Sequence, residues 1–303
     1  MENRRIGFIG LGNMGSRMTK SMVRKGQEVL GFDANSEVIA NSGAKPVASI
    51  EELVKNSDVV LLSLPDSKIV EKVMCGENGA ISKARLGQIF VDLSTASPKS
   101  TRSISALLGE KGAHYLDAGI SGGAAAAEAG TLTLMVGGEV LILESVKSIL
   151  ELFATNIFHL GEIGTGHVAK ILNNFLNAIA LSATAEVMVA GKKAGLDLEV
   201  LLEVLNKSSG VNFATQNRFP KIIKGDYLKG GLSNTLMMKD VVLYTDLVSE
   251  LGVVSLNASA PLASFGLAKA LGYADEISNT VVDAIGDISG GIRIQVEKKE
   301  VAK

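Results

Sequence analysis

The first half of the chain alternates short apolar runs with amphipathic segments. Several of these runs are apolar throughout, as expected for parallel strands that are buried on both faces. We expect strands at residues 6–9, 28–32, 58–64, 88–93, 114–118, 131–136 and 157–160. We expect helices at residues 14–25, 49–56 and 141–153, and another that begins near Pro98. Strands that alternate with helices predict a doubly wound parallel sheet with right-handed crossovers.

The pattern changes after Gly161. A turn over residues 162–166 precedes residues 167–194, which predict one long helix of roughly 40 Å at 1.5 Å per residue. Further helical patterns follow at residues 198–206, 212–223, 234–250, 260–271 and 275–287, and no later strand is clear. The sequence thus predicts two domains. An α/β domain covers residues 1–163, and an all-α domain, which the long helix enters, covers residues 164–303.

Three glycines stand directly after the first expected strand. Gly10, Gly12 and Gly15 have the spacing G-x-G-x-x-G and open the first expected helix. In a dinucleotide-binding turn, the first glycine allows the tight turn, the second lets the backbone approach a pyrophosphate, and the third lets helix and strand pack closely. The N–H groups at the helix start then attract the anion. The alternative is an ordinary strand–helix turn, since a chain with 33 glycines produces this spacing easily.

An acidic residue at the end of the second expected strand makes the glycine motif more specific. Asp33 stands about 20 residues after the glycines, where a carboxylate binds the ribose diol of the adenosine. It would repel the 2′-phosphate of NADP, and residues 31–40 contain no Arg or Lys to receive that phosphate. The sequence therefore predicts a Rossmann domain that uses NAD.

Composition and charge narrow the class of protein. The chain has 303 residues, of which 47% are hydrophobic, so it can bury a large core. Its net charge of −2 provides no footprint for nucleic acid, and we interpret Lys298, Lys299 and Lys303 as a solvated tail. The single cysteine, Cys75, offers no disulfide framework and suits a reducing compartment. We expect this thiol to be packed or at the surface rather than reactive.

We expect a cytoplasmic protein that does not bind membranes. The N-terminus leads directly into the first strand, with no signal-peptide pattern. The most apolar helix, around residues 175–190, is interrupted by Asn177 and Glu186 and preceded by Lys170, so we do not interpret it as a membrane span.

Ser121, Gly122 and Gly123 follow an expected strand directly. A hydroxyl and successive unhindered backbone N–H groups make a cradle for a carboxylate. The segment by itself is equally compatible with a flexible glycine turn.

The long helix carries a lysine and an asparagine one turn apart. Lys170 and Asn174 lie at positions i and i+4, so they share one helix face, and apolar neighbours indicate that the lysine is partly buried where the two domains meet. Burial lowers the pKa of a lysine, and such a group can take the hydroxyl proton when a carbinol is oxidised. The alternatives are a surface lysine whose stem covers apolar surface, and His167 as the base in its place. We otherwise expect His167 to cap the helix or to contact solvent.

Other polar residues carry weaker signals. Lys239, in the segment L-M-M-K-D, is equally compatible with an anion ligand and with a surface lysine paired to Asp240. His114 and His159 lie in expected strands and are interpreted as structural. No cluster has metal-ligand spacing, so no metal site is predicted.

Taken together, these segments resemble the β-hydroxyacid dehydrogenase family, which includes 3-hydroxyisobutyrate dehydrogenase and tartronate semialdehyde reductase. The resemblance covers nearly the whole chain. It rests on ordered motifs: G-F-I-G-L-G-N-M-G at 7–15, L-P at 64–65, D-L-S-T-A-S-P at 92–98, S-G-G at 121–123, G-T-G-H-V-A-K-I-L-N-N at 164–174 and M-K-D at 238–240.

The resemblance implies roles for individual residues. It implies Lys170 as general acid/base and Asn174 as the residue that orients the substrate. Ser121, Gly122 and Gly123 would hold the substrate carboxylate. The cofactor would contact Gly10, Leu11, Gly12, Asn13, Met14, Gly15, Asp33, Leu64, Pro65, Thr95 and Lys239. A homodimer or homotetramer that forms through the helical domain is also implied.

One position departs from the family pattern. The family usually has Asp-Ala-Pro-Val before S-G-G, whereas this chain has Asp117-Ala118-Gly119-Ile120, which loosens the strand before the carboxylate cradle. We expect this change to affect the substrate more than the chemistry. We also expect residues 208–218 to line the substrate pocket.

The sequence therefore predicts an NAD-dependent enzyme that interconverts a small 3-hydroxy carboxylic acid and its semialdehyde or keto acid, similar to 3-hydroxyisobutyrate. Alternatives are a tartronate semialdehyde reductase and a threonate-type or serine-type dehydrogenase. An imine reductase of related architecture would not need a lysine at position 170. A dinucleotide-binding scaffold with a dead site would be expected to have lost Lys170, which is present together with Ser121 and Asn174.

Overall fold

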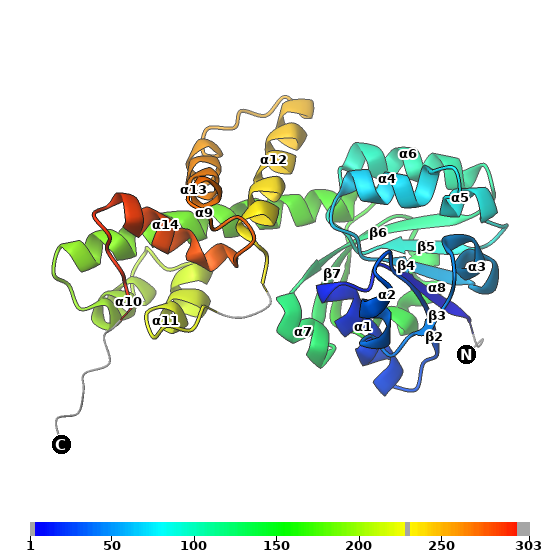
Figure 1. Cartoon of the computed structure of the whole chain (residues 1–303). Coiled ribbons are helices and arrows are strands. Elements are labelled where there is room, and N and C mark those ends of the chain that lie inside the picture. Colours follow the sequence, from blue (N-terminus) through cyan, green and yellow to red (C-terminus); the bar gives the residue numbers. More distant parts are fainter. Residues whose placement is uncertain (1–3, 228–230, 296–303) are drawn as a thin grey trace, which may run out of the picture. The chain divides into compact units, whose positions relative to one another are not determined.

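The computed structural model describes residues 4–227 and 231–295 (Figure 1). Its contacts divide the chain into two compact units, Met1–Lys170 and Ile171–Lys303. The expected boundary at residues 163/164 stays a prediction. The three C-terminal lysines interpreted as a solvated tail lie outside the described residues.

The first unit contains one sheet with the strand order β3-β2-β1-β4-β5-β6-β7-β8. Its strands are β1 (Ile6–Ile9), β2 (Val29–Phe32), β3 (Lys45–Pro46), β4 (Val59–Leu62), β5 (Ile89–Asp92), β6 (His114–Ser121), β7 (Leu132–Gly137) and β8 (Ala154–His159). Its helices are α1 (Asn13–Arg24), α2 (Ser36–Ala40), α3 (Ile50–Asn56), α4 (Ser67–Cys75), α5 (Ala80–Lys83), α6 (Pro98–Gly109), α7 (Gly123–Ala129) and α8 (Val140–Leu150). Chain order reverses between β1 and β4, as in doubly wound folds.

The expectation of a wholly parallel sheet is wrong at one place. Strands β1 to β6 run parallel, but β7 pairs antiparallel with β6, and β8 runs parallel to β7. The connection from β6 to β7 spans only residues 122–131, and its helix, α7, has seven residues. A crossover between parallel strands needs a dozen or more residues. The short connection therefore returns the chain in the opposite direction.

Apolar side chains alternate between the two faces of the sheet. In β4, Val59 and Leu61 belong to one buried cluster, while Val60 and Leu62 belong to another. The first cluster also contains residues of α1 and α8, and the second contains residues of α3, α4 and α6. Figure 1 shows α4 and α6 on one side of the sheet and α1 and α7 on the other. Burial on both faces explains why the central strands are apolar throughout.

The long helix α9 (Thr165–Lys193) agrees with the expected helix at residues 167–194. By length and composition it is the one described helix that could cross a membrane, but 56% of the window that meets this test is buried inside the protein. That burial is expected for the core helix of a globular domain.

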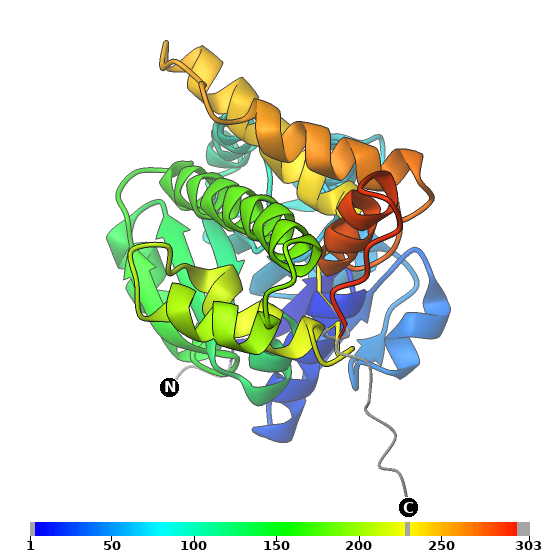
Figure 2. The same cartoon turned by 90° about the vertical axis from the view of Figure 1, so that its left-hand side faces the viewer.

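The second unit is helical. Its elements after α9 are α10 (Leu198–Asn206), η1 (Ala214–Arg218), α11 (Phe219–Ile222), α12 (Asn234–Glu250), α13 (Ser259–Ala270), η2 (Ser278–Thr280) and α14 (Val281–Ile288). Helices α12 and α13 pack against each other (Figure 2). Two predictions need correction. The single helix expected at residues 212–223 is instead a π-helical turn followed by a short helix, because Pro220 cannot donate a helical hydrogen bond. The last helix begins after a 3₁₀ turn, at Val281, rather than at residue 275.

Candidate active site

The turn between β1 and α1 needs glycine at the first and third positions of the motif. Gly10 has a φ of +90°, and a Cβ there would lie 2.3 Å from the carbonyl oxygen of Ser63. A Cβ at Gly15 would lie 1.9 Å from the carbonyl oxygen of Gly10, so helix and strand approach more closely than any side chain allows. A Cβ at Gly12 would meet nothing within 4 Å. Its open backbone is where a pyrophosphate would approach, so the turn fits a dinucleotide.

Asp33 is held in place against this turn. One carboxylate oxygen accepts a hydrogen bond from the backbone N–H of Leu11 at 2.7 Å, and the other accepts one from the N–H of Asn35 at 2.8 Å. A carboxylate has about four acceptor positions, so these bonds orient Asp33 and leave acceptor positions for a ribose diol. The side chain of Asn35 in turn caps α2.

Several further cofactor candidates follow neighbouring parallel strands. Leu64 and Pro65 come after β4, and Thr95 comes after β5. The N–H of Leu64 donates to the Ser94 hydroxyl at 2.9 Å, which ties the two loops together. Because β1, β4 and β5 are adjacent and parallel, these loops and the glycine turn share the carboxyl edge of the sheet. Dinucleotides bind at this edge, where the strand order reverses.

The predicted carboxylate cradle has a backbone that only glycine adopts easily. Ser121 ends β6, Gly122 has a φ of +123° and Gly123 has a φ of +69°. A Cβ at Gly123 would meet nothing within 4 Å, whereas one at Gly122 would lie 2.6 Å from the Cβ of Ala126. These positive φ values favour a segment with a defined backbone conformation over a flexible turn.

Lys170 packs against the strand that ends in this cradle. It is 9% exposed, so it is more deeply buried than the sequence suggested. A Cβ at Gly119 would lie 2.4 Å from the Cβ of Lys170 and 3.0 Å from its Cγ. Glycine at position 119, where the family usually has proline, therefore lets the first turns of α9 approach β6 closely. Sequence reasoning noted this departure but assigned it only a looser strand.

Asp117 anchors the start of α9, and sequence reasoning missed this role. Its two carboxylate oxygens accept hydrogen bonds from the backbone N–H groups of Gly164 and His167, each at 2.7 Å. The carboxylate is fully buried and satisfies N–H groups at the helix N-terminus, where negative charge is favoured. The signal that points to it is an acidic residue in the middle of a buried strand, shortly before S-G-G. Asp117 thus connects the cradle strand to the helix that carries Lys170.

His167 lies in the first turn of α9, and its ring is fully buried. Its Nδ1 is 2.7 Å from the Thr101 hydroxyl, and its Nε2 is 4.0 Å from a carboxylate oxygen of Asp92. The same Asp92 oxygen accepts a hydrogen bond from the Tyr115 hydroxyl, and burial raises the pKa of that phenol well above its ordinary value. The expectation that His167 contacts solvent is wrong, because the helix start packs on this polar cluster. A buried ring favours a structural role over that of a base.

In the second unit, Asp240 connects two of the predicted site residues. The amide of Asn174 donates to Asp240 at 2.5 Å, and the Lys239 ammonium lies 3.1 Å from the same carboxylate. Asp240 is 1% exposed. The pairing of Lys239 with Asp240 leaves both interpretations of this lysine open. Asp240 was not predicted as a site residue, although it is the last residue of the M-K-D motif.

The remaining histidines, the cysteine and the acidic residues give no sign of a further catalytic or metal site in the described residues. Among the described residues, no group of three or more His, Cys, Asp or Glu could hold a metal ion. His114 and His159 lie in β6 and β8, where His159 contacts the carbonyl oxygen of Gly138 at 2.7 Å. Partial burial and nearby Glu71 raise the pKa of the exposed Cys75 thiol, so it is not activated.

Two family models match consecutive parts of the chain. The NAD-binding domain of 6-phosphogluconate dehydrogenase matches residues 5–161. The model described as NAD-binding of NADP-dependent 3-hydroxyisobutyrate dehydrogenase matches residues 164–284. Together they cover both units.

Individual proteins are similar over nearly the whole chain. The 2-(hydroxymethyl)glutarate dehydrogenase of Eubacterium barkeri is 36% identical over 290 residues, which cover 94% of this chain and 96% of that protein. The NAD-dependent L-serine dehydrogenase of Pseudomonas aeruginosa is 36% identical over 282 residues, covering 90% and 94%. The structure of Mycobacterium tuberculosis 3-hydroxyisobutyrate dehydrogenase with L-serine has a TM-score of 0.84 and 32% identity, covering 93% of this chain and 99% of that one.

Proposed function

Since the chain belongs to the β-hydroxyacid dehydrogenase family, whose members are nicotinamide-dependent oxidoreductases that act on hydroxyl groups, we propose that its substrate is a 3-hydroxypropanoate that carries a substituent at C2. The names of this chain's relatives include serine, 3-hydroxyisobutyrate and 2-(hydroxymethyl)glutarate. These three acids share the 3-hydroxypropanoate core and differ in the group at C2. The single observation that supports the proposal is the cradle strand β6, which ends in Ser121 and packs on Lys170 through Gly119.

The chain's own residues would bind, orient and deprotonate this substrate. Ser121, Gly122 and Gly123 bind its carboxylate through a hydroxyl and backbone N–H groups. Asn174, held by Asp240, orients the substrate. Lys170 takes the hydroxyl proton at Nζ in oxidation and returns it in reduction.

The expected cofactor is a nicotinamide dinucleotide, which when bound would supply the hydride acceptor for oxidation of the carbinol carbon. The protein would supply position, electrostatics and the proton path. Gly10, Leu11, Gly12, Asn13, Met14 and Gly15 would hold the pyrophosphate, Asp33 the adenosine ribose, and Leu64, Pro65, Thr95 and Lys239 further parts of the dinucleotide. Because Asp33 would repel a 2′-phosphate, the proposal includes a preference for NAD.

The experiment compares acids with their methyl esters. Serine, 3-hydroxyisobutyrate, glycerate and 2-(hydroxymethyl)glutarate would be screened with NAD at the nicotinamide absorbance, and the best of them compared with the ester of its C1 carboxylate. A charged hydrogen bond contributes about 1.5–3 kcal/mol, so loss of several should lower kcat/KM by at least 10-fold. Equal turnover of acid and ester would contradict the cradle assignment. No turnover of any acid or of the corresponding aldehydes would instead favour a scaffold with a dead site.

The proposal extends to the assembly and location of the protein. We place it in the cytoplasm as a homodimer or homotetramer that forms through the helical domain. Light scattering on the purified chain tests the assembly, and a monomer at assay concentration would contradict it. Oxidation of glycerate as the best acid in the screen, together with reduction of its semialdehyde by NADH, would favour the tartronate semialdehyde reductase alternative.

A further inference from the structure

Arg218 is a half-buried cation whose hydrogen-bond partners among the described residues are all neutral. Its guanidinium donates to the amide oxygen of Asn279 at 2.7 Å and to that of Asn177 at 3.1 Å, with the Ser278 hydroxyl at 3.5 Å. The ring of Phe213 lies 6.0 Å from the guanidinium carbon. Within residues 4–227 and 231–295, no carboxylate forms an ion pair with Arg218.

A second arginine in the same unit shows the usual arrangement. Arg293 forms ion pairs with Asp287 at 2.5 Å and with Asp283 at 3.9 Å. Buried charges are ordinarily paired, because removal from water is costly without a counter-charge. Burial lowers the pKa of Arg218 to about 10, which leaves it charged at neutral pH. Arg218 therefore bears a desolvation cost that the described carboxylates do not offset.

The amides that hold Arg218 also connect it to α9. Asn177 lies on α9 at position i+3 from Asn174 and i+7 from Lys170, so the three side chains share one helix face. Asn279 is 1% exposed and donates to the carbonyl oxygen of Tyr227 at 2.8 Å, which fixes its amide. Arg218 itself ends the π-helical turn η1, an irregularity that occurs often at functional sites. The guanidinium is thus held in a defined orientation by two amides.

We propose that Arg218, oriented by Asn177 and Asn279, binds a second anionic group of the substrate, carried at the end of the substituent at C2. This inference rests on the proposed function and adds the substrate class, a 3-hydroxy acid with two negative charges. A planar guanidinium binds a carboxylate in bidentate fashion, and a phosphate offers the same oxygen geometry.

The test measures kcat/KM with NAD for 2-(hydroxymethyl)glutarate and for the analogue whose distal carboxylate is replaced by an amide. The wild-type enzyme should prefer the dianion by about 10- to 100-fold, the range expected for a charge-assisted hydrogen-bond pair. Arg218→Gln should bring the ratio near one, and Arg218→Lys should retain part of it. Asn177→Asp would place a carboxylate beside the intact guanidinium and should also lower the ratio.

Arg293→Gln is the matched control, because it removes a guanidinium of the same unit that already has carboxylate partners. It should keep the wild-type ratio, and circular dichroism should show the same fold for every variant. A wild-type ratio near one, or an unchanged ratio in Arg218→Gln, would overturn the inference while leaving turnover of other 3-hydroxy acids to support the proposed function.

Direct binding separates the two proposals if no acid is turned over. Calorimetry with NAD present should show that 2-(hydroxymethyl)glutarate binds at least 10-fold more weakly to Arg218→Gln than to the wild type. Equal binding would overturn the inference. Inorganic phosphate should compete with the dianion. Phosphate binding without competition would assign Arg218 to a free anion and overturn the substrate class.

Discussion

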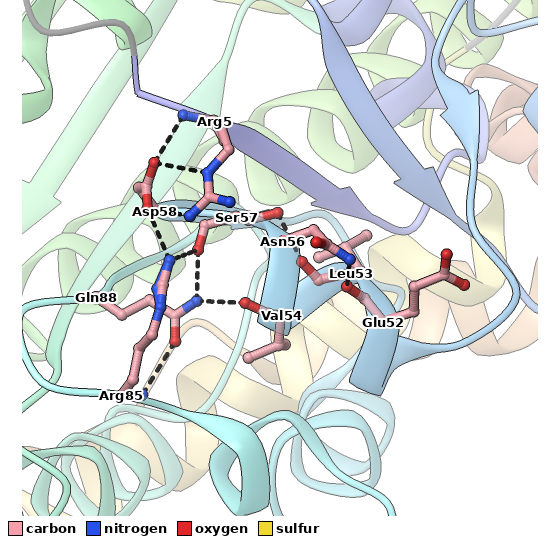
Figure 3. Close-up of polar contacts among 9 residues, drawn as sticks. All are labelled: Arg5, Glu52, Leu53, Val54, Asn56, Ser57, Asp58, Arg85 and Gln88. Carbon is pink, nitrogen blue, oxygen red and sulfur yellow. Dashed lines mark hydrogen bonds and ion pairs between the residues drawn. The ribbon is translucent and has the colours of Figure 1, made fainter.

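The two edges of the sheet in the first unit use polar residues differently. At the amino edge, the chain pairs its polar groups with one another (Figure 3). Asp58 accepts hydrogen bonds from Arg5 at 3.0 Å and from Arg85 at 2.7 Å, and Gln88 donates to the carbonyl oxygens of Val54 and Ser57. This network connects the starts of β1, β4 and β5.

At the carboxyl edge, much of the polar surface is backbone. Gly10, Gly122 and Gly123 have positive φ, and Gly12 and Gly123 have open space where a side chain would be. The Asp33 and Asp117 carboxylates shape this edge by binding backbone N–H groups. The difference indicates that the polar groups of the amino edge stabilise the fold by pairing with one another, whereas the backbone of the carboxyl edge is open to a ligand.

Replacing Lys170 should cause the largest loss at the carboxyl edge. Lys170→Ala should lower kcat by about 10²- to 10⁴-fold, the usual contribution of a general acid/base, and leave NAD affinity nearly unchanged. Stopped-flow absorbance measures turnover, and cofactor fluorescence measures binding. Lys192→Ala, an exposed lysine at the other end of α9, is the control. A loss of less than about 10-fold would contradict the assignment of Lys170.

Asp33 should determine which dinucleotide the carboxyl edge accepts. The wild type should have the higher kcat/KM with NAD, and Asp33→Ser should reduce this preference over NADP by about 10- to 100-fold, because repulsion of the 2′-phosphate and the bond to the ribose are both lost. Glu37→Gln, which changes an exposed acid on nearby α2, should have no such effect. A wild-type preference for NADP would show that the Asp33 assignment is wrong.

Gly119 tests whether close packing of α9 on β6 positions the lysine. Gly119→Ala should lower the free energy of unfolding by about 1–3 kcal/mol, as overpacking does, and lower kcat by up to about 10²-fold through misplacement of Lys170. Denaturant unfolding and steady-state kinetics measure the two effects. Gly109→Ala, at a position where a Cβ would meet nothing within 4 Å, serves as the control. If kcat is unchanged in Gly119→Ala, the contact plays no part in positioning Lys170.

Acid should weaken the amino edge by a small amount. The hydrogen-bonded Arg5 side chain holds the pKa of Asp58 at about 2, below its ordinary 3.8. A lowered folded pKa contributes stability that is present above about pH 4 and is lost as the pH falls through about 2. The Asp58 side chain is 37% exposed, so solvent screening reduces the effect to about 1 kcal/mol. Unfolding free energies of wild type and Asp58→Asn should converge by this amount between pH 5 and pH 2, and parallel curves would contradict the assignment.

Most long elements could be predicted from the sequence because their patterns are local. The ranges 6–9, 198–206 and 234–250 coincide with β1, α10 and α12. Helices α2, α4, α5 and α7 and strand β3 were not predicted. All are short, and the two-residue strand β3 has no periodicity to detect. Such segments are stabilised by contacts with distant residues rather than by their own pattern.

The residues of the candidate site also fall into a group that local motifs predict and a group that they do not. Local motifs were enough to identify the glycine turn, the S-G-G segment and the Lys170–Asn174 pair as candidates, because each motif lies within a few residues of the chain. The roles of Asp117 and Asp240 depend on partners at sequence separations of 47 and 66 residues. No local pattern encodes such pairings.

By itself, the sequence determined the alternation of strands and helices, the family and the candidate chemistry, since hydrophobic period and motif spacing are properties of neighbouring residues. The tertiary structure alone decided the reversed direction of β7, the burial of His167 and the contact between Gly119 and Lys170. It also decided that Arg218 is held by amides rather than by carboxylates. Direction, burial and charge pairing depend on which distant segments the fold brings into contact.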